Sequence, residues 1–323
     1  MYHRFDVMVT AETDTMFDAW VGAVLRNNLL CATEQIDLPD RDMSLFRYCR
    51  QFPLSAQHPL YNELKDGFPA PYYLYVRTPR ATEMTKIQAG QTITFSLTLM
   101  GEISRYITCF MEAIDFMCRK GLGLYSKPFV LNEVREVSAM GENHLLFRDG
   151  EIISRRLLYP VDMETVPTVS AQSDCIRIVF ESPVSLIKQR NRPDPPGYQE
   201  KSNLFPSFYQ LVRTAAYRLE KLHALYAAPH DVDRYNQSHE NMEATLEQAA
   251  SPEIEEINLK RIELKSSRRK NSNETRIPLT GLIGDMTFRG NYKPYITLLK
   301  YMEQLGAGNH LTYGFGKYRI EMQ

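Results

Sequence analysis

The sequence predicts an α+β protein of two similar domains, each an antiparallel sheet with helices on one face. First, strand-like and helix-like hydrophobic patterns follow one another in an order that occurs twice. Second, 323 residues correspond to roughly two domains of about 100–200 residues. Third, 43% hydrophobic and 24% charged residues are typical of a globular chain. We expect domains at residues 1–165 and 166–323, joined near residues 161–174.

The first domain should open with a strand, because apolar residues alternate with polar or smaller ones from Phe5 to Val9. Thr13 or Asp14 can cap a helix after it, and Gly121 can end a second helix. Segments rich in aromatic and β-branched residues favour strands. We therefore expect a strand at 4–10, a helix at 13–30, irregular chain at 31–70 with one short helix near 59–65, strands at 72–78 and 91–101, a helix at 102–121, a strand at 127–137, and a hairpin at 143–157 that turns at Asp149–Gly150.

The same order of patterns returns in the second domain. Leu211, Ala215, Leu219 and Leu222 recur at helical spacing between segments with strand character. We expect a strand at 175–183, a helix within 203–226, strands at 255–266 and 275–290 around a polar turn, a helix at 292–305 and a last strand at 311–322. This order is that of a ferredoxin-like (RRM-like) sandwich, so the sequence predicts two such domains in tandem.

The charge of the chain is balanced overall but uneven along its length. The net charge is −1, while residues 231–256 carry eight acids and one arginine, and residues 260–276 carry seven Lys/Arg and two acids. Arg268, Arg269 and Lys270 fall at the turn of the predicted hairpin. A local basic tip suits contact with RNA phosphates, even on a neutral protein. The alternative is a solvated hairpin face.

Several features exclude other classes of protein. The five cysteines are scattered without a CxxC pair, which is typical of a reducing compartment. Met1 leads into mixed polar and apolar residues, and no run of 18 apolar residues occurs, so we expect a cytoplasmic protein without a membrane partner. No cluster of His, Cys, Asp and Glu has metal-ligand spacing, and we expect neither a metal nor another cofactor.

Glycines cluster near the C-terminus, in GAGNHLTYGFGKY at residues 306–318. Consecutive backbone amides of such a turn can form a nest for an anion, and phosphate is the obvious guest. The segment is neither a P-loop nor a dinucleotide fingerprint, because no helix follows it. The alternative is a Gly306 helix cap and a bulged strand packed closely on its neighbour. Gly281 and Gly284, inside a predicted strand, also suggest a close approach of another backbone.

The basic hairpin, the GLIG strand and the glycine block together resemble the CRISPR-associated Cas6 endoribonucleases of the RAMP superfamily. The residues that carry the resemblance are Arg261, Ser267, Arg269, Gly281, Gly284, Gly290, Gly306, Gly308, Thr312, Gly314, Phe315 and Gly316. Looser matches cover the first half of the chain. Asn309 and His310 stand where the family usually has a lysine.

The resemblance implies tandem ferredoxin-like domains and metal-free cleavage of CRISPR repeat RNA (pre-crRNA). The ribose 2′-OH would attack the adjacent phosphate, leaving a 2′,3′-cyclic phosphate and a 5′-OH, and the crRNA would stay with effector proteins. This reaction needs a general base to accept the 2′-OH proton, a general acid to protonate the leaving 5′-oxygen, and a cation to stabilise the phosphorane. The family places a catalytic histidine in or soon after the first helix, so His58 is one candidate, with Tyr61 and Lys65 as partners. His310, in the loop itself, is the other.

The residues expected to bind RNA come from the hairpin and from the glycine block. They are Arg261, Ser267, Arg268, Arg269, Lys270, Arg289, Gly306, Gly308, Asn309, Gly314, Gly316 and Lys317. Two other functions stay open. The first is a non-catalytic RAMP subunit that binds guide RNA, which the histidine-free first helix favours. The second is an α+β enzyme that uses the loop to bind a small phosphorylated ligand.

Overall fold

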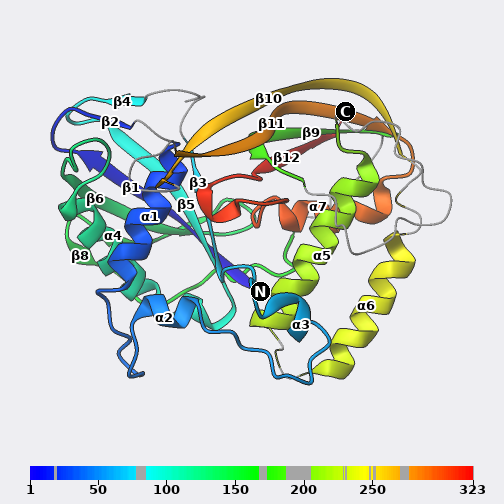
Figure 1. Ribbon diagram of the computed structural model, residues 1–323, viewed down its shortest axis with the longest axis horizontal. Helices are drawn as coiled ribbons and strands as arrows, with labels where there is room; N and C mark the ends of the chain where they lie inside the picture. Colours follow the sequence, from blue (N-terminus) through cyan, green and yellow to red (C-terminus); the bar gives the residue numbers. More distant parts are fainter. Residues whose placement is uncertain are drawn as a thin grey trace.

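A computed structural model describes residues 1–17, 20–77, 85–166, 173–186, 205–227, 229, 231–246, 249, 252–269 and 276–322. Most of its strands form two antiparallel sheets, one from each predicted domain, and a third sheet has only two short strands. Figure 1 shows the first sheet with α1 and α4 on one side of the molecule and the second sheet with α5 and α7 on the other. The predicted domain division near residue 165 falls in the connection between the two large sheets and stays a prediction.

The first sheet has six strands in the order β3-β5-β1-β6-β7-β8. Two helices, α1 (Val21–Thr33) and α4 (Ile107–Lys120), share one apolar core with it. Phe5, Val7 and Val9 on β1 are fully buried in this core, as their alternation predicts. The strands are β1 (Tyr2–Ala11), β3 (Tyr72–Val76), β5 (Thr92–Met100), β6 (Phe129–Val137), β7 (Asn143–Arg148) and β8 (Glu151–Ile152).

The second sheet has four strands in the order β10-β11-β9-β12. They are β9 (Cys175–Val184), β10 (Glu253–Arg269), β11 (Arg276–Arg289) and β12 (Tyr318–Met322), with α5 (Phe208–Tyr226) and α7 (Ile296–Met302) packed on them. In both domains the first strand lies between the third and the fourth, and the second strand pairs with the third. This is the ferredoxin-like order, so the predicted tandem fold is confirmed.

Shorter elements complete the chain. They are β2 (Thr15–Phe17), α2 (Leu45–Cys49), α3 (Tyr61–Leu64), β4 (Thr85–Ile87), η1 (Gly101–Tyr106), α6 (Val232–Leu246), η3 (Lys293–Tyr295) and η4 (Leu311–Tyr313). None of the helices in the described ranges is both long enough and apolar enough to cross a membrane.

Two predicted boundaries are wrong and one helix was not predicted, each for a physical reason. The first helix starts at Val21 and not at residue 13, because Thr15–Phe17 pair with Thr85–Ile87 as a small sheet. The last strand starts at Tyr318 and not at residue 311, because the glycine-rich chain before it turns through η4. The acid-rich stretch after residue 231 contains α6, which the charge pattern alone did not indicate.

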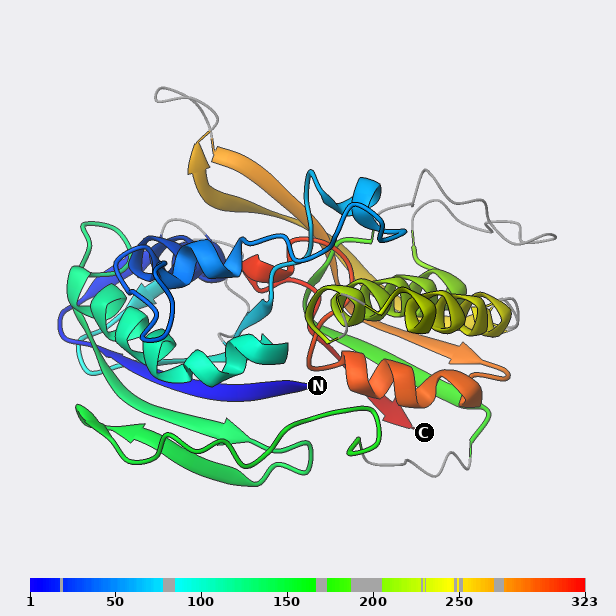
Figure 2. The same cartoon turned by 90° about the horizontal axis from the view of Figure 1, so that it is seen from below.

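The long β10–β11 hairpin reaches from the second domain to the first. Figure 1 shows it arching over the molecule toward α1, and Figure 2 shows the same reach from below. Leu264 of β10 and Leu279 of β11 are buried with Ala23 of α1 and Phe315 of the glycine-rich segment. The hairpin stem therefore holds α1 and this segment together, and both contribute to the site described below.

A buried carboxylate, that of Glu136, holds in place the segment of chain that follows the first sheet. Glu136 on β6 is fully buried and accepts hydrogen bonds from His3 Nδ1 (2.7 Å) and from the backbone amides of Leu158 (2.7 Å) and Tyr159 (3.0 Å). Burial by itself would raise the pKa of Glu136, but these hydrogen bonds outweigh it and hold that pKa below its usual range. The carboxylate is thus a structural anchor.

We expect Glu136→Gln to lower the free energy of unfolding at pH 7 by about 2–4 kcal/mol, because an amide NH₂ would face donors in a buried site. Since the pKa is lowered in the folded state, this stabilisation is present above the unfolded pKa of about 4.3 and is lost as the pH falls through the lower folded value. Urea unfolding at pH 7 and pH 3 measures both effects. Exposed Glu142→Gln is the control, and an equal loss in both variants would contradict the anchor.

Candidate functional site

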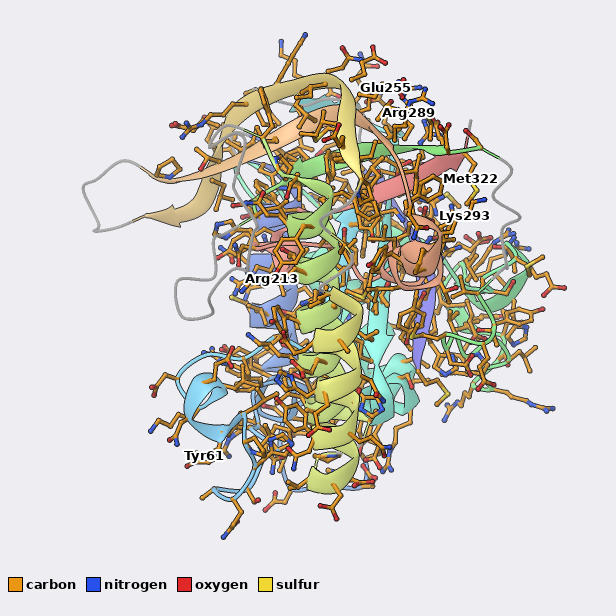
Figure 3. All side chains as sticks on the ribbon, turned by 90° about the vertical axis from the view of Figure 1, so that its right-hand side faces the viewer. Tyr61, Arg213, Glu255, Arg289, Lys293 and Met322 are labelled. Carbon is orange, nitrogen blue, oxygen red and sulfur yellow. The ribbon has the colours of Figure 1, made fainter. Side chains whose placement is uncertain are left out.

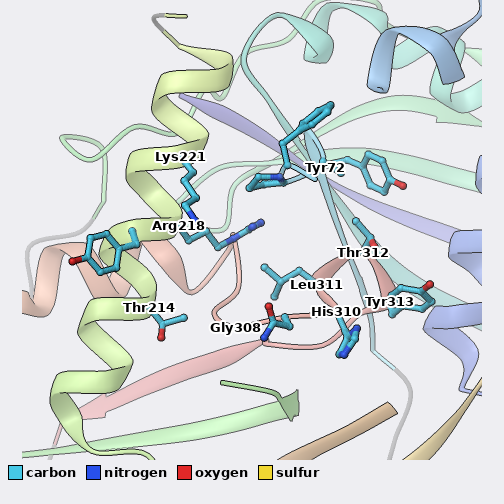
Figure 4. Close-up of a pocket in the computed structure, with 14 residues that line it drawn as sticks. Tyr72, Thr214, Arg218, Lys221, Gly308, His310, Leu311, Thr312 and Tyr313 are labelled. Carbon is cyan, nitrogen blue, oxygen red and sulfur yellow. The ribbon is translucent and has the colours of Figure 1, made fainter. Parts of the chain in front are cut away.

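A cleft of about 520 Å³ opens where the two domains meet (Figure 4). One wall is the end of the arm, which we define as residues 52–70, together with Tyr72 of β3. The opposite wall is α5, which presents Thr214, Tyr217, Arg218 and Lys221. The floor is formed by residues 308–313 of the glycine loop, defined here as residues 306–316. Both domains therefore shape the cleft.

The glycines of this loop are required for two reasons: their backbone conformation and the close packing around them. All four have a left-handed backbone, with φ of +74°, +93°, +82° and +79° at Gly306, Gly308, Gly314 and Gly316. A Cβ on Gly316 would lie 2.3 Å from the carbonyl oxygen of Ala307, and one on Gly308 would lie 2.5 Å from that of Ser185. Much of the loop is thus tightly packed, as the alternative interpretation of the sequence expected.

Three consecutive amides of the loop stay available. His310 has a left-handed backbone (φ 59°, ψ 26°), and η4 follows with right-handed turns. Such a change of hand directs successive N–H groups toward one point, which is the geometry of an anion nest. The amides of His310, Leu311 and Thr312 donate to no acceptor in the described part of the chain, whereas those of Asn309 and Gly316 donate to carbonyls. The three amides lie on residues that line the cleft.

Arg218 brings a cation to the opposite wall of the cleft. Its Nε donates to the carbonyl of Leu305 (3.3 Å), and no carboxylate of the described residues lies within ion-pair distance. Burial lowers the pKa of Arg218 to about 10, so the guanidinium is charged at pH 7. Lys221, one turn along the helix, pairs with Glu63 of the arm at 2.5 Å. A desolvated arginine without a carboxylate is a strong site for a phosphate.

The first domain contributes a second arginine. Arg26 on α1 donates through Nε to Thr312 Oγ1 (3.3 Å), and its guanidinium lies 4.5 Å from the centre of the Tyr313 ring. It too has no carboxylate partner among the described residues. Gly22 permits this approach, because a Cβ there would lie 2.2 Å from the carbonyl oxygen of Tyr313. Arg26 thus contacts the loop from the first domain, whereas Arg218 lines the cleft from the second domain.

His310 places an imidazole beside the free amides. Its side chain is exposed on one side, and its ring packs edge-on against Tyr313 (6.0 Å between centres) and Phe315 (5.8 Å). Partial desolvation lowers the pKa of His310 below its usual range, so the ring is neutral at pH 7. A neutral imidazole can accept a proton from a ribose hydroxyl.

The other residues predicted to be catalytic lie outside this cleft. His58 is 3% exposed, packs on Tyr235 of α6 and accepts a hydrogen bond from the amide of Leu60 at Nδ1. Tyr61 packs on Phe52, and Lys65 donates to Asn62 within the arm. Because these three side chains face other surfaces, we do not include them in the catalytic proposal below.

The residues predicted to bind RNA are spread over several surfaces. Gly308 and Asn309 line the cleft, whereas Gly306, Gly314 and Gly316 support the loop from within. Arg289 is paired with Asp174 and Glu255, and Figure 3 shows it beside Glu255 at one end of the molecule, far from Tyr61.

Arg261 is exposed on β10. Ser267, Arg268 and Arg269 end that strand, with side chains outside the described part of the chain, and Lys270 lies outside the described residues altogether. Lys317 lines a separate cleft of about 680 Å³ between the two sheets, where burial lowers its pKa to about 8. The RNA-binding assignments therefore stay predictions.

Arg26, Arg218 and Lys221 were not among the site residues predicted from the sequence. A signal for two of them was present, because Thr214, Arg218 and Lys221 recur at helical spacing and form a polar stripe along α5. Arg26 begins a run of three polar residues inside the apolar α1. Neither signal indicates which other element the side chain meets. Among the described residues, no group of three His, Cys, Asp or Glu side chains is placed to hold a metal ion.

The tandem ferredoxin-like domains and the glycine-rich loop agree with the fold that the resemblance to Cas6 implies. Residues 178–318 match the model of the family described as CRISPR-associated endoribonuclease Cas6, so the resemblance to Cas6 is confirmed. Residues 1–160 match the model of a second family, described as an N-terminal domain. No curated protein sequence matches the chain.

Solved structures agree with this fold. A product complex of Thermus thermophilus Cas6 is 13% identical, with 99% of each chain covered and a TM-score of 0.54. A Cas6-related protein of Pyrococcus furiosus is 11% identical, with 100% of each chain covered and a TM-score of 0.50. A partial Cas6-RT-Cas1–Cas2 complex is 15% identical over 100% of this chain and 46% of the other, with a TM-score of 0.52. At such identities the likeness concerns the fold.

Proposed function

We propose that this chain is a metal-independent endoribonuclease that cleaves CRISPR repeat RNA in the cleft between its domains. One observation carries the proposal. Three free amides of the glycine loop line the same cleft as Arg218, Arg26 contacts this loop at Thr312, and neither arginine has a carboxylate partner among the described residues. Such a site suits a phosphodiester, whose charge develops further in the transition state of cleavage. The match to the Cas6 family model supplies the class of RNA.

In this proposal each group in the cleft or in contact with its loop has one role. The neutral His310 accepts the proton of the ribose 2′-OH, whose oxygen then attacks the adjacent phosphorus. The loop amides and the two arginines stabilise the negative charge on the phosphorane oxygens. Lys221 donates a proton to the leaving 5′-oxygen. The products are a 2′,3′-cyclic phosphate and a 5′-OH, so no water enters the step.

We further propose that the product RNA stays bound and that other CRISPR proteins recognise the complex. A Cas6 of the same fold is described as a product complex, and another Cas6 occurs in a complex with RT, Cas1 and Cas2. Arginines that hold phosphate in the transition state also contact it in the product. Slow release of the crRNA would follow from these shared contacts.

Incubation with repeat RNA and excess EDTA should give a product with a 2′,3′-cyclic phosphate end at an undiminished rate. His310→Ala should slow single-turnover cleavage by about 10²–10⁴-fold, the usual contribution of a general base. Because the pKa of His310 is lowered, the rate should fall only as the pH drops below about 6.5, where the base becomes protonated. His144→Ala, on β7 and outside the cleft, is the matched control. Loss of cleavage in EDTA would contradict the mechanism.

The second candidate function is a non-catalytic RAMP subunit that binds guide RNA. Two observations favour it: α1 contains no histidine, and His58 lies outside the cleft. The same assay separates the two functions. Tight, salt-dependent binding of repeat RNA without any cleavage between pH 6 and 9 would support the subunit.

A further inference from the structure

The arm is fastened to the helices of the second domain. Glu63 of α3 pairs with Lys221 of α5, and the Tyr226 hydroxyl at the end of α5 donates to the carbonyl of Pro69. A small separate core lies beneath these two contacts. It is formed by Leu54, Leu60 and Leu64 of the arm with Ala224, Leu225 and Tyr235 of α5 and α6. Polar and apolar contacts thus hold the arm to a helix of the other domain.

These contacts lie at one end of the cleft. Phe68 and Pro69 of the arm line one wall, and α5 lines the other as far as Lys221. Tyr226 follows about 7–8 Å further along the helix, and there the two walls are joined by its hydrogen bond to Pro69. The cleft is therefore closed at the end where the arm meets α5. Its volume of about 520 Å³ is within the range that encloses one drug-sized molecule, which is comparable to about one or two nucleotides.

We propose that the arm restricts the cleft to unpaired RNA, with Glu63 and Tyr226 as the residues that determine this specificity. A single strand can bring one phosphate to the loop amides and Arg218 and place its next base against Phe68. A base-paired stem would bring a second strand and its phosphates into the space where the arm contacts α5. The inference rests on the proposed function, which identifies the RNA as CRISPR repeat RNA. It concerns whether the cleft can bind single-stranded or base-paired RNA.

Binding of 2′-O-methyl repeat RNA tests the inference, because this RNA lacks the 2′-OH nucleophile. Fluorescence anisotropy would compare the labelled single strand with the same strand annealed to its complement. The wild-type protein should bind the single strand at least about tenfold more tightly, equivalent to about 1.4 kcal/mol. Glu63→Gln with Tyr226→Phe, which removes both polar contacts between the arm and α5 and leaves their shared apolar core, should reduce this ratio by about fivefold or more. Asp66→Asn, an exposed acid of the arm, should leave the ratio unchanged.

The outcomes for the arm and for the catalytic proposal are separable. Equal binding of the single strand and the duplex, or an unchanged ratio in the Glu63→Gln/Tyr226→Phe protein, would overturn the inference about the arm. Thermal unfolding of that protein shows whether the variant is folded. Unmodified RNA is assayed in parallel. A retained preference for the single strand without any cleavage would overturn the catalytic proposal alone and would support the arm as a filter.

Discussion

Replacing Arg218 with methionine is expected to slow single-turnover cleavage of repeat RNA by about 10²–10³-fold, the usual effect of removing one donor that stabilises transition-state charge. Arg218 has no carboxylate partner in the described chain, so its charge is available to the RNA. Methionine keeps most of the apolar stem that packs between the domains. We therefore expect a large loss of rate and a melting temperature close to that of the wild-type protein.

The matched control is Arg119→Met, which removes an exposed arginine that pairs with Asp115 on α4, away from the cleft. This variant should cleave at the wild-type rate, since Arg119 lies away from the cleft and cannot contact the phosphate. Cleavage by Arg218→Met within about twofold of wild type would contradict the site, because an unpaired guanidinium beside the reacting phosphate cannot be neutral in its effect. Arg26→Met repeats the comparison for the first domain.

Local pattern was sufficient to predict most of the fold. Strand β1 follows directly from its alternating residues, and the Asp149–Gly150 turn has the positive φ values, 48° and 92°, that its sequence indicates. Ser207 caps α5 through a capping box with Gln210, a local signal that is present in the sequence but was not among the predictions. These features depend on residues that lie close together in the sequence, so a single sequence contains the information needed to predict them.

Features that depend on distant partners could not be predicted in the same way. Thr15–Phe17 extend a helical pattern in the sequence, but pairing with Thr85–Ile87 decides that they form a strand. The candidate site also depends on residues that are distant in the sequence. The glycine loop is visible in the sequence, whereas the position of Arg218 and Arg26 beside it depends on the packing of two domains. Proximity in sequence to the first helix favoured His58, but the apolar residues Leu54 and Leu60 bury the arm around it.

Gly316→Ala is expected to lower the free energy of unfolding by about 3 kcal/mol or more and to abolish measurable cleavage. The left-handed φ of +79° costs an L-residue about 1–2 kcal/mol by itself. The new Cβ would also lie 2.3 Å from both the carbonyl oxygen of Ala307 and Cδ2 of Leu311, and the carbonyl belongs to backbone that cannot yield. Leu311 carries one of the three free amides, so relief of the clash must distort the anion site.

Gly141→Ala separates the two causes, because Gly141 also has a left-handed φ of +87° but open space around its Cβ position. It should cost only the conformational term of about 1–2 kcal/mol in urea unfolding and leave cleavage unchanged. Equal losses of stability in the two variants would show that packing against Ala307 and Leu311 is unimportant. Full cleavage by Gly316→Ala would be a more serious contradiction, because it would mean that the RNA is cut without the amides of residues 310–312 held in their present turn.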